Sequence, residues 1–149
     1  MDQYSALNKN IPKVIFIGKP NVGKSTLFNT IIGRKEAIVG EEVGLTRDFQ
    51  DIRHFIGNIQ VFLSDTAGIS IKDNKKLTQM SRVNTLKKIE LSDLIFFLID
   101  GSNELTNEDH ACANYLRKFK KKVILLSNKA ELKQSKNYKD QGYTLGFDK

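Results

Sequence analysis

The sequence is poor in the residues that cross-link chains, hold metals through sulfur or cross membranes. It has one cysteine, Cys112, and no tryptophan among 149 residues. One cysteine excludes an internal disulfide and a metal site built from cysteines. No apolar run approaches the roughly 20 residues that a membrane-spanning helix needs, and the longest, 94–99, has the length of a buried strand. Residues 1–10 are polar and lack an apolar signal segment. These absences predict a cytoplasmic protein that does not engage a membrane.

Acidic residues are fewer than basic ones. There are 17 Asp and Glu against 24 Lys and Arg, which leaves a formal net charge of +7. Such an excess favours polyanionic partners such as RNA, but lysines that only keep the surface soluble explain it equally well. The chain is long enough for one domain with a core and too short for two. We expect a monomer in which a polar lead-in, 1–11, precedes one domain over residues 12–149.

Hydrophobic periodicity predicts an alternation of strands and helices. Strands are expected at 13–17, 51–55, 58–64, 94–100 and 123–127. Helices are expected at 24–32, 82–91 and 106–119. Gly57-Asn58 predicts a hairpin, and Thr106 predicts a helix N-cap. Two long stretches without periodicity, 34–48 and 65–79, predict functional or mobile loops. This order indicates an α/β fold with a mostly parallel sheet and one antiparallel strand.

Four predicted strands are followed at once by polar or glycine residues. These residues are Gly18, Asp65, Asp100-Gly101 and Asn128. Ligands of open α/β sheets bind at the carboxyl ends of the strands. We therefore expect these four positions, far apart in sequence, to converge on one edge of the sheet.

The segment after the first strand has the pattern Gly-x4-Gly-Lys-Ser of a phosphate-binding loop. Its glycines let successive backbone N–H groups point at phosphate oxygens, and the helix that follows adds its positive end. Lys24 is expected to bridge the β- and γ-phosphates and the Ser25 hydroxyl to bind Mg²⁺. A chance glycine turn with a surface lysine would not need a strand before it and a helix after it. The expected nucleotide contacts are Gly18, Lys19, Pro20, Asn21, Val22, Gly23, Lys24, Ser25 and Thr26.

Two further segments are expected to act on the metal and the γ-phosphate. Asp65-Thr66-Ala67-Gly68 closes a predicted strand, where Asp65 would hold Mg²⁺ through water and the Gly68 N–H would touch the γ-phosphate. Alone, Asp-x-x-Gly is a common turn, and its assignment depends on the phosphate-binding loop. Thr46 is expected to ligate Mg²⁺ and sense the γ-phosphate as part of a switch loop; a solvated threonine is the alternative.

The segment after the last predicted strand, Asn128-Lys129-Ala130-Glu131, is expected to read the base. An asparagine amide can meet the O6/N7 edge of guanine, and the stem of Lys129 can lie along the ring. The Glu131 carboxylate can accept hydrogen bonds from guanine N1–H and N2–H, donors that adenine lacks. An ordinary polar loop is the alternative, and the phosphate-binding loop at the other end of the expected site favours guanine.

With these motifs together, the chain resembles the translation-factor-like class of Ras-type GTPases. More narrowly, it resembles the first GTPase domain of the bacterial Der (EngA) family. The resemblance rests on the motifs at 18–29, 44–48, 65–68 and 128–129 and on the stretch Leu145-Gly146-Phe147. It implies a Ras-like P-loop fold, binding of GTP or GDP with Mg²⁺, slow GTP hydrolysis, and a role in assembling the large ribosomal subunit with rRNA as a partner.

The resemblance also bears on the catalytic residues. Ile69 follows Gly68 where Ras-like enzymes carry a glutamine that orients the attacking water. Similar GTPases use a K⁺ ion near the β- and γ-phosphates, held partly by the asparagine that is Asn21 here. The resemblance therefore implies K⁺-stimulated hydrolysis, with Asn21, Lys24, Thr46 and Gly68 as the residues that take part.

The chain departs from the family pattern in two respects. Glu131 stands where the family usually has aspartate, which moves the carboxylate one methylene further out. The serine-alanine motif behind the guanine ring, the last strand and helix, and the further Der domains do not occur in the 149 residues, so the chain is expected to correspond to part of a Der protein. Two other readings remain: a nucleotide- or RNA-binding module without useful turnover, and a P-loop kinase or ATPase, against which the order of Asp65-x-x-Gly68 and Asn128-Lys129 argues.

Overall fold

Five short strands form one sheet in the computed structural model, which describes residues 11–33, 51–65, 85–132, 138 and 140–147. The elements are β1 (Lys13–Ile17), α2 (Lys24–Ile32), β2 (Asp51–Ile56), β3 (Ile59–Asp65), β4 (Leu94–Asp100), α4 (Asn107–Leu116), β5 (Lys122–Asn128) and the 3₁₀ helix η3 (Gln141–Leu145). Residues 85–91 are also helical. Each described strand and α-helix therefore lies where the periodicity predicted it, with ends that shift by a few residues, whereas η3 was not predicted.

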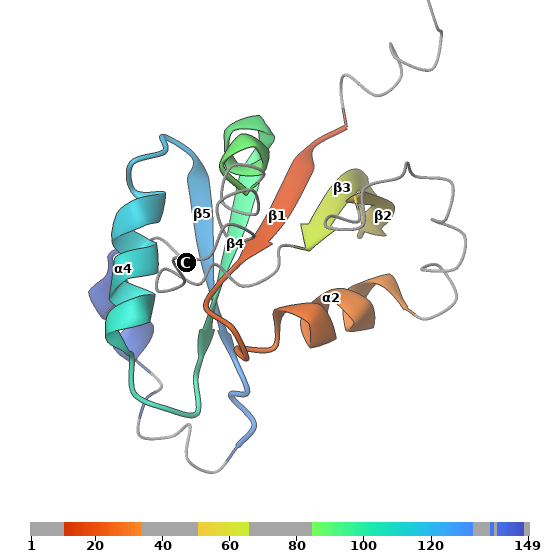
Figure 1. Ribbon diagram of the computed structural model, residues 1–149. Coiled ribbons are helices and arrows are strands. Elements are labelled where there is room, and N and C mark those ends of the chain that lie inside the picture. The colour runs from red at the N-terminus through yellow and green to blue at the C-terminus, as the bar shows by residue number, and fades with distance from the viewer. Residues whose placement is uncertain (1–10, 34–50, 66–84, 133–137, 139, 148–149) are drawn as a thin grey trace, which may run out of the picture.

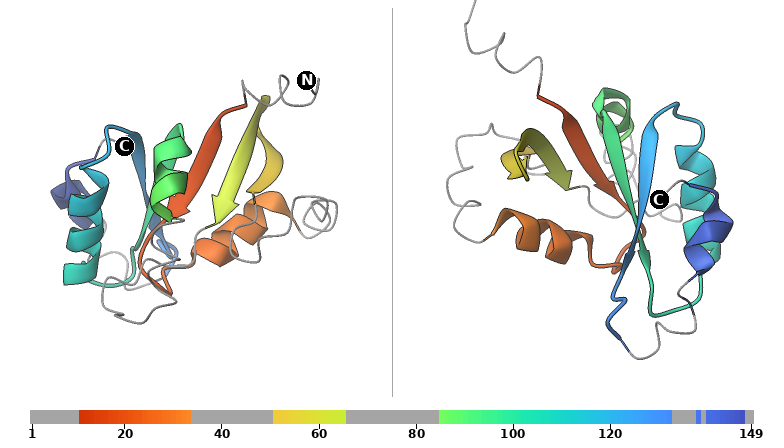
Figure 2. Two further views of the ribbon diagram at one scale, coloured as in Figure 1. Left: turned by 45° about the horizontal axis from the view of Figure 1, so that its top comes forward. Right: turned by 180° about the vertical axis from the view of Figure 1, so that it is seen from behind.

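The strand order in the sheet is β2-β3-β1-β4-β5 (Figures 1 and 2). β1 pairs in parallel with both β3 and β4, and β4 pairs in parallel with β5. Only β2 runs antiparallel, against β3, which confirms the predicted mostly parallel sheet. From β1 the chain goes first to one side of the sheet and then to the other. The carboxyl end of β1 is therefore the topological switch point, where open α/β sheets bind ligands.

Both faces of the sheet are covered, which explains why the central strands read as continuous apolar runs. Val14 and Phe16 pack with Phe28 and Ile32 of α2 on one face. The alternate residues of β1 pack on the other face, in a cluster that takes residues from the 85–91 helix, α4 and η3: Ile15, Ile17, Ile89, Cys112, Ala113, Leu116 and Leu145. Two buried layers on a parallel sheet hold the loops after its strands against one another.

The hairpin and the N-terminus of α4 form for local reasons. Ile56 pairs with Ile59, and Gly57 takes the φ of 61° that the primed hairpin turns need at their first position. Thr106 caps α4: its N–H donates to Asp109 Oδ2 at 2.8 Å, and the Asp109 N–H donates to its hydroxyl at 3.4 Å. This reciprocal pair is a capping box.

The predicted C-terminal limit of this helix was wrong. The helix was expected to reach Phe119 and ends at Leu116. Beyond it, the backbone amides of Lys118 and Phe119 donate to carbonyls three residues earlier. These tighter turns replace the i to i−4 pattern of an α-helix, and the chain turns into β5.

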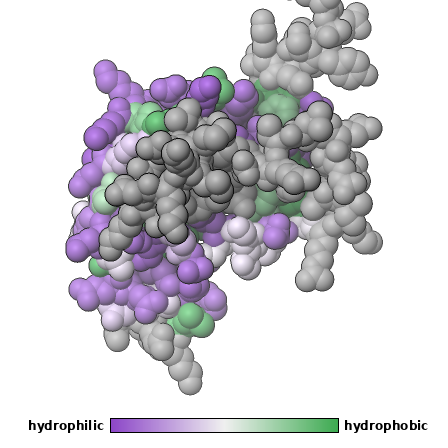
Figure 3. All heavy atoms as spheres, in the orientation of Figure 1, coloured by the Kyte–Doolittle hydropathy of each residue, from purple (hydrophilic) through white to green (hydrophobic). Residues whose placement is uncertain are grey.

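The segment 140–147 docks beside α4. The Gln141 side chain donates to the Asn103 carbonyl at 2.6 Å and accepts from the Leu105 N–H at 2.9 Å. Phe147 packs edge-on against Phe97 with 5.8 Å between ring centroids. In Figure 3, the described surface on the α4 side is mostly hydrophilic.

Two further predictions concern the long loops and a membrane-spanning helix. The predicted loops 34–48 and 65–79 lie outside the described residues, apart from Asp65. Within the described part of the chain, no helix is long and apolar enough to span a bilayer.

Candidate functional site

The loop that joins β1 to α2 turns sharply inward. Asn21 and Gly23 have φ values of 65° and 95°, both in the left-handed region that L-residues avoid. Val22 between them is buried, with 1% of its surface exposed, and anchors the loop to the core. α2 then starts with a hydrogen bond of 2.9 Å from the Leu27 N–H to the Gly23 carbonyl. Alternating backbone of this kind forms a nest of N–H groups, and the first N–H groups of a helix extend it.

The two glycines of the loop are required by close packing. A Cβ at Gly18 would lie 2.6 Å from the carbonyl oxygen of Leu98 in β4. A Cβ at Gly23 would lie 2.3 Å from Nδ2 of Asn128. At Gly18 the neighbour is backbone, so an added side chain would push the loop away from β4. At Gly23 an added side chain would displace the Asn128 amide, and the φ of 95° would be strained. The glycines therefore let the loop sit directly on β4 and on the last residue of β5.

Lys24 places a positive charge inside this loop. The residue is 6% exposed, and its Nζ donates to the Gly18 carbonyl at 3.0 Å. A nest of N–H groups that encloses a buried ammonium suits a phosphate group. The residues present therefore fit the nucleotide phosphates that the motif predicts.

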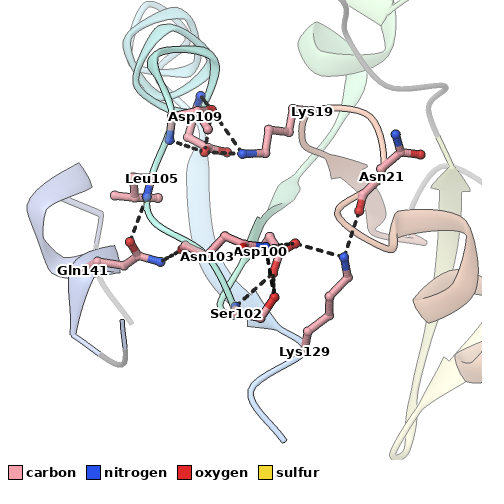
Figure 4. Close-up of polar contacts among 10 residues, drawn as sticks. Lys19, Asn21, Asp100, Ser102, Asn103, Leu105, Asp109, Lys129 and Gln141 are labelled. Carbon is pink, nitrogen blue, oxygen red and sulfur yellow. Dashed lines mark hydrogen bonds and ion pairs between the residues drawn. The ribbon is translucent and has the colours of Figure 1, made fainter. Parts of the chain in front are cut away.

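The end of β5 is fastened to the same loop (Figure 4). The Asn128 amide donates to the Val22 carbonyl at 2.9 Å. Lys129 has a φ of 59°, which turns the chain out of the strand. Its Nζ donates to the Asn21 carbonyl at 3.1 Å and to Asp100 Oδ2 at 2.9 Å. The base-reading and phosphate-binding segments therefore form one unit.

Asp100 is the acidic partner at the end of β4. Burial alone would raise the pKa of Asp100. Hydrogen bonds from Ser102, Lys129 and Asn103 outweigh burial, so its pKa lies well below the usual range. Gly101 beside it donates to the Asn128 carbonyl at 2.7 Å, and a Cβ there would lie 2.2 Å from Ser127 Oγ. This charged, tightly packed corner orients Lys129.

Lys19 points away from the loop interior, toward α4 (Figure 4). Its Nζ lies 2.7 Å from Oδ2 of Asp109. One further group lies nearby. The pKa of the Cys112 thiol is raised to about 12, chiefly by burial and also by the charge of Asp109, while the charge of Lys24 acts in the opposite direction. Asp109 and Lys24 are thus close enough to act on one thiol, and Cys112 is a residue of the buried core.

The structure brings together most of the predicted site and leaves part of it undescribed. Gly18 to Thr26, Asn128 and Lys129 lie around the switch point, with Pro20, Ser25 and Thr26 exposed. Asp65 ends β3 and pairs with Phe16. Glu131 is exposed beyond Lys129. The predicted residues Thr46, Thr66, Ala67 and Gly68, with Ile69, lie outside the described residues. Among the residues described, no group of three or more His, Cys, Asp or Glu side chains could hold a metal ion.

The roles of two carboxylates could not be predicted from the sequence. Asp100 was expected near the site as a strand end, but not as the partner of Lys129. Asp109 was not among the predicted site residues. The available signal was the Thr-x-x-Asp spacing of a capping box at 106–109, which predicts the cap but not the contact with Lys19.

Comparison with known proteins agrees with this geometry. The model of the family described as 50S ribosome-binding GTPase matches residues 13–129. GTPase Der of Mycoplasmopsis pulmonis (strain UAB CTIP) is 41% identical over 137 residues, which cover 91% of this chain and 30% of that protein. GTPase Der of Thermotoga sp. (strain RQ2) is 42% identical over 137 residues, with 90% and 31% covered. The chain thus spans about 30% of the length of these relatives.

Solved structures share the fold. The crystal structure of Era in complex with MgGDPNP and nucleotides 1506–1542 of 16S ribosomal RNA has a TM-score of 0.72 and 31% identity, over 90% of this chain and 47% of that one. The G domain of the T. maritima iron transporter FeoB has a TM-score of 0.65 and 26% identity, over 93% and 84% of the two chains.

The sheet order and the joined loops define a Ras-like P-loop GTPase domain. The chain belongs to the family of 50S ribosome-binding GTPases. The predicted fold class and the predicted similarity to Der are both confirmed.

Proposed function

We propose that this domain binds GTP and GDP with Mg²⁺, hydrolyses GTP slowly, and acts as a molecular switch in the assembly of the large ribosomal subunit. One observation carries the proposal: the Asn128 amide is bound to Val22 of the phosphate-binding loop. A residue of the predicted base-reading motif is therefore held at a fixed distance from the phosphate site, as a nucleotide with its base and phosphates requires.

The predicted site residues have separate tasks in this proposal. The loop amides and Lys24 bind the phosphates and stabilise negative charge that develops during in-line attack of water. Ser25 and Asp65, with Thr46, would hold Mg²⁺, which neutralises charge between the β- and γ-phosphates. Thr66, Ala67 and Gly68 complete the phosphate contacts. The loops at 34–48 and 65–80 would be the segments that respond to the γ-phosphate.

The residues 128–131, at the other end of the site, would recognise the base. Asn128 meets the O6/N7 edge of guanine, the stem of Lys129 lies along the ring, and Glu131 accepts from N1–H and N2–H. Inosine lacks the N2 amino group, so it removes one donor without changing the rest of the base. GDP should therefore bind more tightly than IDP, and Glu131→Ala should remove most of that difference.

The proposal also includes a K⁺ ion near the phosphates, rRNA as a partner and location in the cytoplasm. The exposed Asn21, with its φ of 65°, lies beside the phosphate site, and we expect it to help bind a K⁺ ion there. The Era neighbour is described in complex with 16S ribosomal RNA, and the net charge of this chain is +7. Both support an rRNA partner, and the description of the family as 50S ribosome-binding supports the large subunit as its place.

Nucleotide titration followed by phosphate release tests the proposal. Fluorescent GDP, GTP and ATP are titrated with Mg²⁺ present, and phosphate release from GTP is then measured. We expect guanine nucleotides to bind at least tenfold more tightly than ATP, because the adenine edge lacks the two donors. Lys24→Ala should abolish binding, whereas the same change at the exposed Lys118 should not. Preference for ATP would contradict the proposal, and GTP binding without phosphate release would support a binding module instead.

A further inference from the structure

We propose that Asp109, at the start of α4, positions the phosphate-binding loop by holding Lys19, and that this pair slows the release of bound guanine nucleotide. The inference rests on the nucleotide site proposed above. It gives α4, which lies beside the site, a direct contact with the loop that would surround the phosphates.

The carboxylate of Asp109 is shared between two elements (Figure 4). Asp109 is 1% exposed. Its Oδ2 accepts from Lys19 Nζ at 2.7 Å, from the Thr106 N–H at 2.8 Å and from the Thr106 hydroxyl at 2.9 Å. Its Oδ1 is also buried and has no hydrogen-bond partner among the residues that the structure describes. The charge of Asp109 is thus balanced chiefly by Lys19.

This arrangement exceeds what a helix cap needs. A capping box is satisfied by the reciprocal contacts of Thr106 and Asp109, and an uncharged side chain can make them. A buried carboxylate, in contrast, needs a cation. Because Lys19 supplies it, the contact fixes the second residue of the phosphate-binding loop to the helix.

Two lysines hold the outer half of the loop from different elements. Lys19 reaches from the loop to α4, and Lys129 reaches from the end of β5 to the Asn21 carbonyl. Functional groups keep their geometry when the residues that support them are themselves fixed. Without the contact to Asp109, the outer half of the loop would be held from the β5 side alone. The loop amides would then be positioned less firmly around the phosphates.

Four single variants separate positioning from capping and from direct phosphate contact. Lys19→Met removes the ammonium and keeps the stem, while Lys19→Arg keeps the charge. Asp109→Asn removes the charge but retains an oxygen for the Thr106 N–H. Thr106→Ala removes the capping hydroxyl, which also accepts from Lys19 Nζ at 3.1 Å, but it leaves the charge pair of Lys19 and Asp109. It therefore separates the charge pair from the cap and from this neutral contact.

The main measurement is the dissociation rate of fluorescent GDP, with thermal unfolding measured in parallel. We expect Lys19→Met and Asp109→Asn each to raise the rate about tenfold, which corresponds to a coupling typical of contacting residues. The double variant should be no faster than the faster single variant, and Lys19→Arg should stay near the original rate. Thr106→Ala should lower the melting temperature without a matching change in rate.

Three results would overturn the inference. Additive effects of Lys19→Met and Asp109→Asn would mean that Lys19 acts on the nucleotide by itself. Unchanged GDP dissociation rates in both variants would mean that the ion pair has a purely structural role. Acceleration by Thr106→Ala equal to that of Lys19→Met would assign the effect to the cap or to the hydroxyl contact of Thr106 with Lys19, and not to the ion pair.

A nucleotide-free readout keeps this test separate from the proposed function. Amide hydrogen exchange of residues 21–24 should quicken in Asp109→Asn and not in Thr106→Ala. If the unaltered protein binds no GDP, the proposed function fails, and the exchange rates still decide whether Asp109 positions the loop. Unchanged exchange in Asp109→Asn would reject that role.

Discussion

The side-chain amide of Asn128 donates a hydrogen bond of 2.9 Å to the Val22 carbonyl, although the two residues are 106 positions apart. A carbonyl accepts only from the nitrogen of the amide, so the contact also fixes the direction of the Asn128 oxygen. The same nitrogen lies 2.3 Å from the place that a Cβ on Gly23 would take. The phosphate-binding loop and the base-reading motif therefore pack directly against each other. A substitution in one should disturb the geometry of the other.

Asn128→Ala should weaken GDP binding by roughly tenfold to a hundredfold. The change removes the expected contact with the base and leaves the Val22 carbonyl without its partner, and an unmet buried hydrogen bond costs about 1–3 kcal/mol. Fluorescent GDP titration measures the loss. Asn114→Ala, on the exposed side of α4, is the control and should bind GDP normally. Equal affinities of the two variants would contradict the role given to Asn128.

Gly23→Ala should disrupt both the loop and the nucleotide site. An alanine at a φ of 95° costs about 1–2 kcal/mol of backbone strain, and its Cβ would collide with Asn128. Gly57→Ala is the matched control, because its φ is 61° but no atom lies within 4 Å of the added Cβ. Thermal unfolding and GDP titration should show both variants destabilised and only Gly23→Ala defective in binding. A Gly23→Ala protein that binds GDP normally would refute the packing argument.

Asp100 should make stability depend on pH in the acidic range. Its folded pKa lies below the unfolded value of 3.8, so its contribution is present above that value and is lost as the pH falls through the folded pKa. Urea unfolding of the unaltered protein and of Asp100→Asn measures the difference in unfolding free energy. We expect that difference to be largest near neutral pH and to shrink below about pH 4. A difference that stays constant with pH would exclude a lowered pKa for Asp100.

Phosphate release should be faster in KCl than in NaCl at equal ionic strength. The expectation follows from the resemblance to GTPases that use K⁺ and from the place of Asn21 beside the phosphate site. Asn21→Ala should reduce the K⁺ stimulation and keep much of the Na⁺ rate. Equal turnover of the unaltered protein in the two salts would rule out K⁺ stimulation.

Cys112 should be unreactive in the folded protein. Burial raises the pKa of its thiol to about 12, and the thiolate is the reactive form. A thiol reagent at neutral pH should therefore label Cys112 only as fast as the protein unfolds. Full labelling in concentrated urea is the control for reagent and stoichiometry. Rapid labelling without denaturant would show that the α4 face is open to solvent.

Local patterns in the chain were sufficient for the elements and for the motifs. β1 and β4 read as buried strands because both faces of the sheet are covered, and α2 reads as a helix because one side of it packs on that sheet. The loop after β1 is recognisable because its glycines, lysine and serine must occur at fixed spacing to bind a phosphate. The end of α4 was misplaced because a change from i−4 to i−3 hydrogen bonds leaves little trace in the residue pattern.

Partners between distant segments depend on the strand order, which local periodicity does not encode. Lys19 and Asp109 are 90 residues apart, and Lys129 and Asp100 are 29 apart. They meet because β1 lies beside β4, β4 lies beside β5, and α4 packs on the same sheet. The sequence could therefore name the residues that touch a nucleotide, whereas the residues that hold those residues in place became visible only once the sheet was assembled.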